Sequence, residues 1–211
     1  MPLLDCPLCL NQKSHLYHVD SYRNYYQCAV CELVFVPSHQ HLSIADEKAI
    51  YDLHQNHDHD EGYRRFLSRL SQPLLERLPA NAQGLDFGCG PGPVLAEIFR
   101  EQGHDVKVYD PFYAPDRACL DRRYDFVTAT EVVEHFQQPA HSFDQLFSLI
   151  KTNGILALMT KLVIDAEAFS RWHYKNDQTH VSFYSKTTLH WLASHYRRKI
   201  DILGKDVMIF H

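Results

Sequence analysis

The positions of apolar residues predict alternating strands and helices from residue 81 onward. Short apolar runs indicate strands near Leu85 and over 105–109, 124–130 and 155–162, the last apolar enough for burial on both faces. One-face apolar spacing predicts helices through Val94, Leu95, Ile98 and Phe99 and through Phe143, Leu146, Phe147 and Ile150. This alternation predicts an α/β fold with a mostly parallel sheet.

Helices and a hairpin are expected on either side of this alternation. Helices are expected over 46–54 and 61–78; the second has one-face apolar spacing and is interrupted or restarted at Pro73. Ser185 is a suitable amino-terminal cap for a helix that runs to Tyr196. Apolar runs at 200–203 and 207–210 flank a glycine and predict a closing hairpin.

Length and charge narrow the classes of protein to consider. The 211 residues, 45% of them hydrophobic, suffice for one α/β domain with a small appendage. No apolar run approaches the roughly 20 residues that cross a bilayer, and the start lacks the regions of a signal peptide, so we expect a cytoplasmic protein without a membrane partner. The net charge of -5 disfavours a chain that coats nucleic acid.

The segment 85–92, Leu-Asp-Phe-Gly-Cys-Gly-Pro-Gly, predicts a nucleotide-binding turn. Its glycines let the backbone approach a ligand where side chains would collide, and a helix starting near Gly92 directs free N–H groups to the same place. A dinucleotide fingerprint needs its third glycine where Pro93 stands, so the spacing is wrong for a pyrophosphate.

Two acids indicate the charge of the expected ligand. Asp86, two residues before the first glycine, would repel the phosphates of a dinucleotide and attract a cation. Asp110, at the end of the next predicted strand, is placed to accept hydrogen bonds from ribose hydroxyls. S-adenosylmethionine carries an ammonium and a sulfonium beside its adenosine. It therefore offers positive charge to Asp86 and ribose hydroxyls to Asp110.

With these residues the chain resembles the class I S-adenosylmethionine-dependent methyltransferases. The first motif of that family is similar to residues 86–92, and its ribose acid matches Asp110. The resemblance implies a doubly wound, Rossmann-like sheet of seven strands and cofactor contacts at Asp86, Phe87, Gly88, Cys89, Gly90, Gly92, Asp110 and Glu131. The segment 111–123 is shorter and more polar than the family's usual helix and third strand, which predicts that this helix is missing.

Four cysteines near the start have the spacing of a metal site. Two C-x-x-C pairs fit a four-thiolate zinc site, formed by Cys6, Cys9, Cys28 and Cys31. Metal binding would supply the folding energy of a small zinc ribbon over 1–45. Disulfides are the alternative, disfavoured because nothing marks the chain as secreted. Such a ribbon could read nucleic acid, dock a partner or cover the catalytic domain, although it has few cations for phosphate.

A second polar group follows the predicted strand over 124–130. Glu131, Glu134 and His135 share one face if this turn is helical, and His180 lies in a loop expected at the same sheet edge. Two carboxylates and two imidazoles suit a divalent ion such as Mg, Mn, Fe or Zn. The alternative is that Glu131 contacts the cofactor while the others are ordinary turn and loop residues.

The same four residues resemble the E-x-x-E-H and distal histidine signature of two groups of metal-dependent methyltransferases. One group modifies the terminal 2'-hydroxyl of small RNAs, and the other methylates catechols in ubiquinone biosynthesis. The resemblance implies catalytic roles for Glu131, Glu134, His135 and His180. Four aromatic residues are candidates for an acceptor pocket, namely Trp172, His173, Tyr174 and Phe183. Core packing is the alternative for Trp172 and Phe183.

The sequence thus predicts a zinc ribbon at 1–45 and a methyltransferase domain at 46–211, with leading helices over 46–80 and the α/β core over 81–211. The expected reaction transfers a methyl group from S-adenosylmethionine to a small-molecule acceptor, at oxygen, with a divalent metal as a candidate cofactor. The alternatives are 2'-O-methylation of RNA, which the acidic balance opposes, and a regulatory protein that binds S-adenosylmethionine without turning it over.

Overall fold

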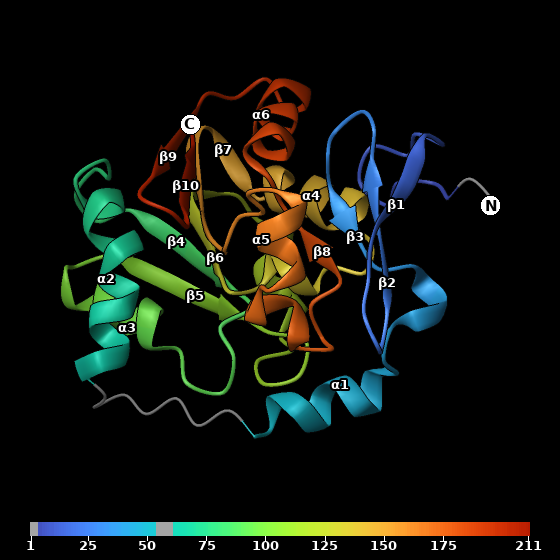
Figure 1. Ribbon diagram of the computed structural model, residues 1–211. Helices are drawn as coiled ribbons and strands as arrows, with labels where there is room; N and C mark the ends of the chain where they lie inside the picture. Colours follow the sequence, from blue (N-terminus) through green and yellow to red (C-terminus); the bar gives the residue numbers. More distant parts are fainter. Residues whose placement is uncertain (1–3, 54–60) are drawn as a thin grey trace. The chain divides into compact units, whose positions relative to one another are not determined.

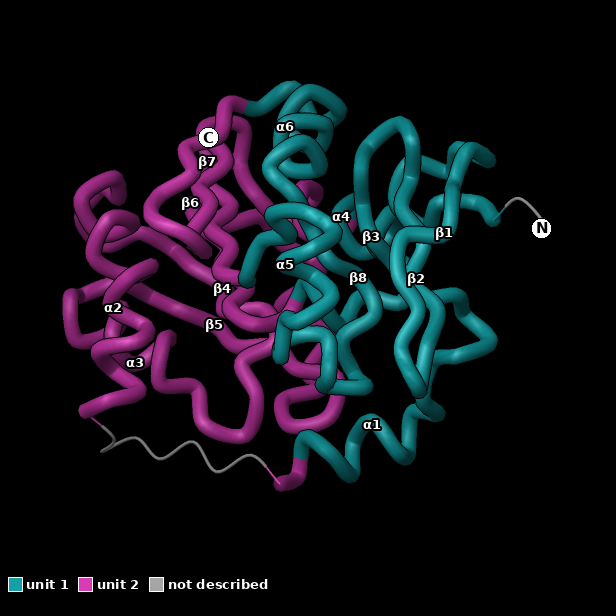
Figure 2. Tube along the Cα trace, in the orientation of Figure 1, with its two compact units in different colours: residues 1–51, 133–144, 161–198 teal, residues 52–132, 145–160, 199–211 magenta. Residues whose placement is uncertain are grey.

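The computed structural model describes residues 4–53 and 61–211, which form two compact units. Unit 1 comprises Met1–Tyr51, Val133–Asp144 and Lys161–Arg198, and unit 2 comprises Asp52–Val132, Gln145–Thr160 and Lys199–His211 (Figure 2). The division predicted at residue 45 differs from these units because 133–144 and 161–198 belong with the amino-terminal residues. No helix in the described part of the chain is long and apolar enough to cross a bilayer.

Unit 2 is built on a six-stranded sheet in the order β5-β4-β6-β7-β10-β9 (Figure 1). Its strands are β4 (Gln83–Phe87), β5 (Asp105–Tyr109), β6 (Tyr124–Thr130), β7 (Ile150–Met159), β9 (Ile200–Leu203) and β10 (Val207–Phe210). The first four strands in this order are mutually parallel, whereas β10 is antiparallel to both of its neighbours. This confirms the doubly wound, mostly parallel α/β sheet, with β4 and β6 at the point where the strand order reverses.

The sheet has six strands among the described residues, not the predicted seven. The missing strand falls at residues 111–123, where the chain forms a short 3-10 helix, η2 (Arg117–Asp121), and no α-helix. This segment is too short and too polar to supply both a buried strand and a covering helix. As a result β5 is an edge strand of the sheet.

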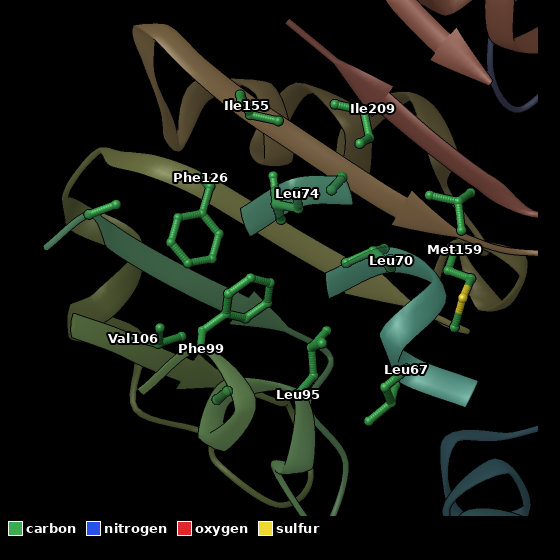
Figure 3. Packing of buried hydrophobic residues seen from close by; sticks show 14 of the residues in the cluster. Leu67, Leu70, Leu74, Leu95, Phe99, Val106, Phe126, Ile155, Met159 and Ile209 are labelled. Atoms are coloured by element: carbon green, nitrogen blue, oxygen red, sulfur yellow. The ribbon is translucent and has the colours of Figure 1, made fainter. Parts of the chain in front are cut away.

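Helices α2 (Glu61–Leu75) and α3 (Val94–Glu101) supply apolar faces to the core of unit 2 (Figure 3). Leu67, Leu70 and Leu74 recur at helical spacing along α2 and are fully buried. The helix continues through Pro73, where an interruption was predicted, and ends two residues later. Gly103, with φ of 84°, follows α3 in the left-handed conformation in which many helices end.

Gly84 makes room for a ring on the neighbouring strand. It pairs in register with Phe126 of β6, and a Cβ atom at Gly84 would lie 2.2 Å from the tip of that fully buried ring. We therefore expect Gly84→Ala to lower the free energy of unfolding by about 1–3 kcal/mol, measured by urea denaturation. The same substitution should cost less in a Phe126→Leu background, and an equal cost in both backgrounds would contradict the steric explanation.

Unit 1 has a four-stranded antiparallel sheet in the order β1-β2-β3-β8. Its strands are β1 (Ser14–Val19), β2 (Asn24–Cys28), β3 (Val34–Phe35) and β8 (Ser182–Phe183). The fourth strand therefore comes from a segment that is distant in the chain. Its core is aromatic, with Tyr25, Phe169, Tyr174 and Phe183 all buried.

The remaining elements of unit 1 are short helices. They are η1 (Ser38–Gln40), α1 (Ile44–Tyr51), η3 (Val133–His135), α5 (Ala166–Ser170), η4 (His173–Asn176) and α6 (Lys186–His195). Ser185 caps α6 as predicted, because its Oγ accepts a hydrogen bond from the Thr188 N–H at 3.1 Å. Helix α4 (Pro139–Ser148) contributes residues to both units, and Ile150, predicted as helical, begins β7.

Candidate functional site

The glycine turn follows β4 as predicted. Gly88 and Gly90 have φ of 76° and 64°, a region that favours glycine. The N–H groups of Gly88 and Cys89 donate to the Tyr109 carbonyl at 2.7 and 3.2 Å, which fixes the turn against the end of β5. Helix α3 begins at Val94, two residues after the last glycine. The turn therefore lies at the carboxyl end of the parallel strands, where α/β sheets bind ligands.

Asp110 holds the glycine turn and the loop after β5 together. Its Oδ2 accepts from the Gly90 N–H at 3.0 Å, and its Oδ1 accepts from the N–H groups of Phe112 and Tyr113 at 2.8 and 3.0 Å. Sequence reasoning missed this structural role, although Asp before Pro111 is a known signal for such a turn. The predicted ribose contact stays a prediction.

Asp86 is buried inside unit 2, with 4% of its surface exposed. Its Oδ1 accepts a hydrogen bond from the Thr128 hydroxyl on β6 at 2.7 Å, a partner that the sequence did not indicate. Burial raises the pKa of Asp86 to about 6, although the bond from Thr128 opposes this. At neutral pH the turn therefore stands next to a buried negative charge, as the argument for a cationic ligand requires.

The raised pKa of Asp86 makes the stability of unit 2 depend on pH. In the folded state the carboxyl keeps its proton up to about pH 6, but in the unfolded chain it loses it near pH 4. The contribution of Asp86 to stability is therefore most favourable below pH 4 and becomes less favourable as the pH rises to about 6. Asp86→Asn keeps an acceptor for Thr128 and should gain about 3 kcal/mol over the wild type between pH 4 and pH 7, measured by urea denaturation. If the difference in free energy of unfolding between Asp86→Asn and the wild type did not change with pH, a raised pKa of Asp86 would be contradicted.

The four amino-terminal cysteines converge in unit 1. The Sγ atoms of Cys6, Cys9, Cys28 and Cys31 all lie within 4.8 Å of one another, and none of the four forms a disulfide. A hydrogen bond from the Cys31 thiol lowers the pKa of Cys6 to about 6, which favours the thiolate that binds metals. The group has the residues and spacing to hold a tetrahedral metal ion.

The two cysteine pairs sit on turns of the same shape. The Leu10 N–H donates to the Cys6 carbonyl at 3.0 Å, and the Glu32 N–H donates to the Cys28 carbonyl at 3.1 Å. Leu10 and Glu32 both have positive φ, 60° and 57°, which is unusual for residues other than glycine. Two matching turns that aim four thiols at one point support a metal site further.

A second group of ligand atoms forms in unit 1. Glu134 and His135 lie on η3, and their side chains have ligand atoms within 4.8 Å of His180. The rings of His135 and His180 are 4.7 Å apart between centroids. Glu134 is fully buried and accepts a hydrogen bond from the Tyr174 hydroxyl. The structure thus brings together three of the four predicted residues.

Both imidazoles are oriented by main-chain carbonyls. Nδ1 of His180 lies 2.7 Å from the Tyr174 carbonyl, and Nδ1 of His135 lies 3.3 Å from the Thr179 carbonyl. Because a carbonyl only accepts, Nδ1 carries the proton in each neutral ring and the lone pair is on Nε2. Burial lowers the pKa of His180 and so favours the neutral ring. This arrangement suits metal ligands and proton acceptors alike.

Glu131 does not share a helical turn with the group. It has φ of 52°, its N–H donates to the Met159 carbonyl at 2.7 Å, and η3 begins two residues later. The common face predicted for Glu131, Glu134 and His135 is therefore absent. Glu131 belongs to unit 2, and its expected contacts with metal and cofactor stay predictions.

Three of the four aromatic residues considered for an acceptor pocket pack in or against the core of unit 1, whereas His173 is exposed. Tyr174 and Phe183 are buried in its core, and Trp172 packs against that core. Lys161 approaches the Tyr174 ring, with Nζ 5.0 Å from the centroid. Tyr174 therefore serves mainly to connect the core with Glu134.

Comparisons with known proteins agree with this architecture. A family model described as a methyltransferase domain matches residues 55–196, well over half of the chain. No curated protein matches the sequence.

Two solved structures illustrate the similarity in fold. One is 1,6-didemethyltoxoflavin-N1-methyltransferase of Burkholderia thailandensis, with its substrate and S-adenosylhomocysteine bound. It is 15% identical, with a TM-score of 0.55 over 94% of this chain and 97% of that chain. The other is an O-methyltransferase family protein of the same organism, 14% identical, with a TM-score of 0.51 over 78% of this chain and 62% of that chain.

The family match, the sheet order and the glycine turn beside a buried acid agree with one another. The chain belongs to the methyltransferase domain family and is an S-adenosylmethionine-dependent methyltransferase.

Proposed function

We propose that this enzyme methylates a hydroxyl group of a small-molecule acceptor and that Glu134, His135 and His180 hold a divalent metal ion for the reaction. The observation that carries the proposal is the convergence of these three side chains within 4.8 Å in unit 1. We also propose that the four cysteines hold a structural zinc ion.

The proposal of a small-molecule acceptor is supported by one solved structure that matches nearly the whole of this chain. The N1-methyltransferase of Burkholderia thailandensis is matched over nearly its whole length, and its structure holds the small molecule 1,6-didemethyltoxoflavin. That enzyme methylates nitrogen, so the choice of oxygen rests on the site of this chain. A neutral amine is nucleophilic without help, whereas a hydroxyl needs a base or a metal ion nearby to lose its proton.

The residues of the chain divide the work of methyl transfer. S-adenosylmethionine supplies an electrophilic methyl group. The glycine turn admits the donor close to the backbone, and Asp86 places a negative charge beside it. Nε2 of His135 and of His180 carries the lone pair that would bind the ion, because Nδ1 of each ring is directed at a carbonyl. Without an ion, the same nitrogen of either ring is the candidate base for the hydroxyl proton. A divalent ion held by Glu134, His135 and His180 would lower the pKa of the hydroxyl and fix its direction.

A panel of acceptors tests the proposal. Formation of S-adenosylhomocysteine would be followed with catechols, phenols and amines of matched shape, with and without Mg²⁺ or Mn²⁺. We expect turnover of hydroxyl acceptors that is stimulated by the metal and lost on chelation under conditions that retain one zinc per chain. Turnover of amines alone, or hydroxyl methylation that chelation leaves unchanged, would contradict it. RNA as the acceptor would show itself by binding that weakens steeply as salt rises.

The expected ribose contact of Asp110 gives a separate prediction. Asp110→Asn keeps one acceptor oxygen for the loop but removes the charge, and it should weaken binding of S-adenosylhomocysteine by about tenfold or more in calorimetry. Asp116→Asn is the control, because Asp116 likewise accepts a main-chain N–H, from Ala118, at an exposed position. Equal affinities in Asp110→Asn and the wild type would remove the ribose role.

A further inference from the structure

Arg23 is a buried cation that binds main-chain carbonyls. It lies between β1 and β2, with 5% of its surface exposed. Its Nη1 donates to the carbonyls of Gln178 and His180, both at 2.9 Å. Its Nη2 donates to the carbonyls of Lys175 and Asp177 at 2.5 and 3.0 Å. One guanidinium therefore binds four carbonyls of the segment 175–180, which ends at His180.

The neighbours of Arg23 hold the same segment. The Tyr25 hydroxyl on β2 also lies 3.3 Å from the Lys175 carbonyl. Lys175 is itself buried, and its Nζ contacts Oδ2 of Asp20 at 3.2 Å. Asp20 in turn accepts from the Tyr25 hydroxyl at 2.9 Å and from the Arg23 N–H at 2.9 Å. The turn between β1 and β2 is thus joined to the start of the segment through side chains and main chain.

The chain directly after His180 is held by the amino-terminal sheet. The Val36 N–H donates to the Val181 carbonyl at 2.9 Å, and β8 then pairs with β3. The Val181 N–H donates to the Glu134 carbonyl at 2.9 Å. His180 is therefore fixed from both sides by residues of the same amino-terminal segment that carries the cysteines.

The chemistry of this contact requires arginine. A planar guanidinium offers five N–H donors in a fixed fork, and an ammonium offers three from a single point. Without the fork, buried carbonyls of the segment lose their donors, and the segment must move to find others. Such movement would turn the His180 ring, because its Nδ1 is directed at the Tyr174 carbonyl, next to Lys175.

We propose that Arg23 is a positioning residue. It couples the fold of the amino-terminal cysteine module, residues 4–36, to the placement of His180, so that the Glu134, His135 and His180 group binds a divalent ion only while the module is folded. This inference rests on the proposed function, which assigns that group as a metal site. Under this proposal the cysteine module helps to form the metal site of the methyltransferase and is not a separate binding domain.

Binding of Mn²⁺ tests the proposal, because this ion prefers oxygen and nitrogen ligands to the thiolates of the cysteine site. Protein with one zinc per chain would be titrated with Mn²⁺ and followed by electron paramagnetic resonance. We expect Arg23→Met to weaken Mn²⁺ binding by about tenfold or more, as substitutions of residues that orient metal ligands do. Arg171→Met is the matched control, since Arg171 is exposed and pairs only with Glu167 among the described residues. It should bind Mn²⁺ like the wild type.

A second readout does not depend on the metal. The imidazole resonances of His180, assigned with a His180→Gln variant, should shift in Arg23→Met and stay in place in Arg171→Met. If the wild type binds no Mn²⁺ but the resonances still shift, the metal assignment fails and the positioning role stands. If neither the Mn²⁺ affinity nor the resonances change in Arg23→Met, the positioning role is overturned.

Arg23→Lys covers the case in which Arg23→Met loses its zinc or does not fold. Lysine keeps the buried charge and donates to some of the carbonyls, so the variant should fold. We expect Mn²⁺ affinity between those of the wild type and Arg23→Met, with a smaller shift of the His180 resonances. Binding and resonances identical to the wild type would contradict the need for the guanidinium fork.

Discussion

Glu134→Gln should lower the metal-stimulated rate of methyl transfer by about a hundredfold or more, because it removes the only carboxylate of the group that the structure assembles from described residues. The amide oxygen of glutamine can still accept the hydrogen bond from Tyr174, so the packing of the buried side chain is preserved. We therefore expect the loss in kcat and in Mn²⁺ affinity, with little change in the binding of S-adenosylmethionine. Steady-state kinetics and calorimetry measure these quantities.

Asp144→Asn is the control for this experiment. Asp144 also accepts a hydrogen bond from a tyrosine hydroxyl, that of Tyr196 at 2.7 Å, but it is outside the metal-binding group. The variant should keep the wild-type rate. Full activity in Glu134→Gln would show that the carboxylate takes no part in the reaction and would leave the two histidines as general bases only.

Cys28→Ser should remove the bound zinc and unfold the amino-terminal module. A structural zinc ion contributes on the order of 10 kcal/mol to the free energy of unfolding of a small domain. The variant should therefore lose several times the roughly 1 kcal/mol that an ordinary substitution costs. Because His180 is held by this module, the variant should also lose Mn²⁺ binding. Metal analysis and thermal unfolding report the two effects.

Cys119→Ser is the control for the cysteine site. Cys119 is also a free, buried cysteine but lies in unit 2 on η2, so its variant should keep one zinc per chain. Zinc retained at full stoichiometry in Cys28→Ser, with an unchanged unfolding temperature, would contradict a four-thiolate site.

The sequence predicted those elements that are determined by residues close together in the chain. The apolar run of β6 was predicted with its observed bounds, and so was the hairpin of β9 and β10. Ser185 was identified as a cap because capping is a contact between residues three apart. The sheet of unit 1 was beyond such reasoning, since β8 has only two residues and pairs with β3 across most of the chain.

In the candidate site too, features that depend on neighbouring residues were predicted and contacts between distant residues were not. The glycine turn carries its own pattern, and the positive φ angles of Gly88 and Gly90 agree with it. The partner of Asp86 could not be predicted, because Thr128 is one ordinary residue of an apolar strand. The role of Arg23 could not be predicted either, because its four acceptors lie about 150 residues further along the chain.

The edge position of β5 has a consequence for how the protein behaves at high concentration. An open edge strand presents main-chain groups to which the strand of another molecule can add, and this is a common start of aggregation. Here the Arg100 side chain donates to the Val106 carbonyl at 3.1 and 2.6 Å, and Asp105 and Lys107 place charges on the same strand. The β5 edge, next to which the described residues place no further strand, is thus protected against strand addition by the Arg100 side chain and by the charges of Asp105 and Lys107.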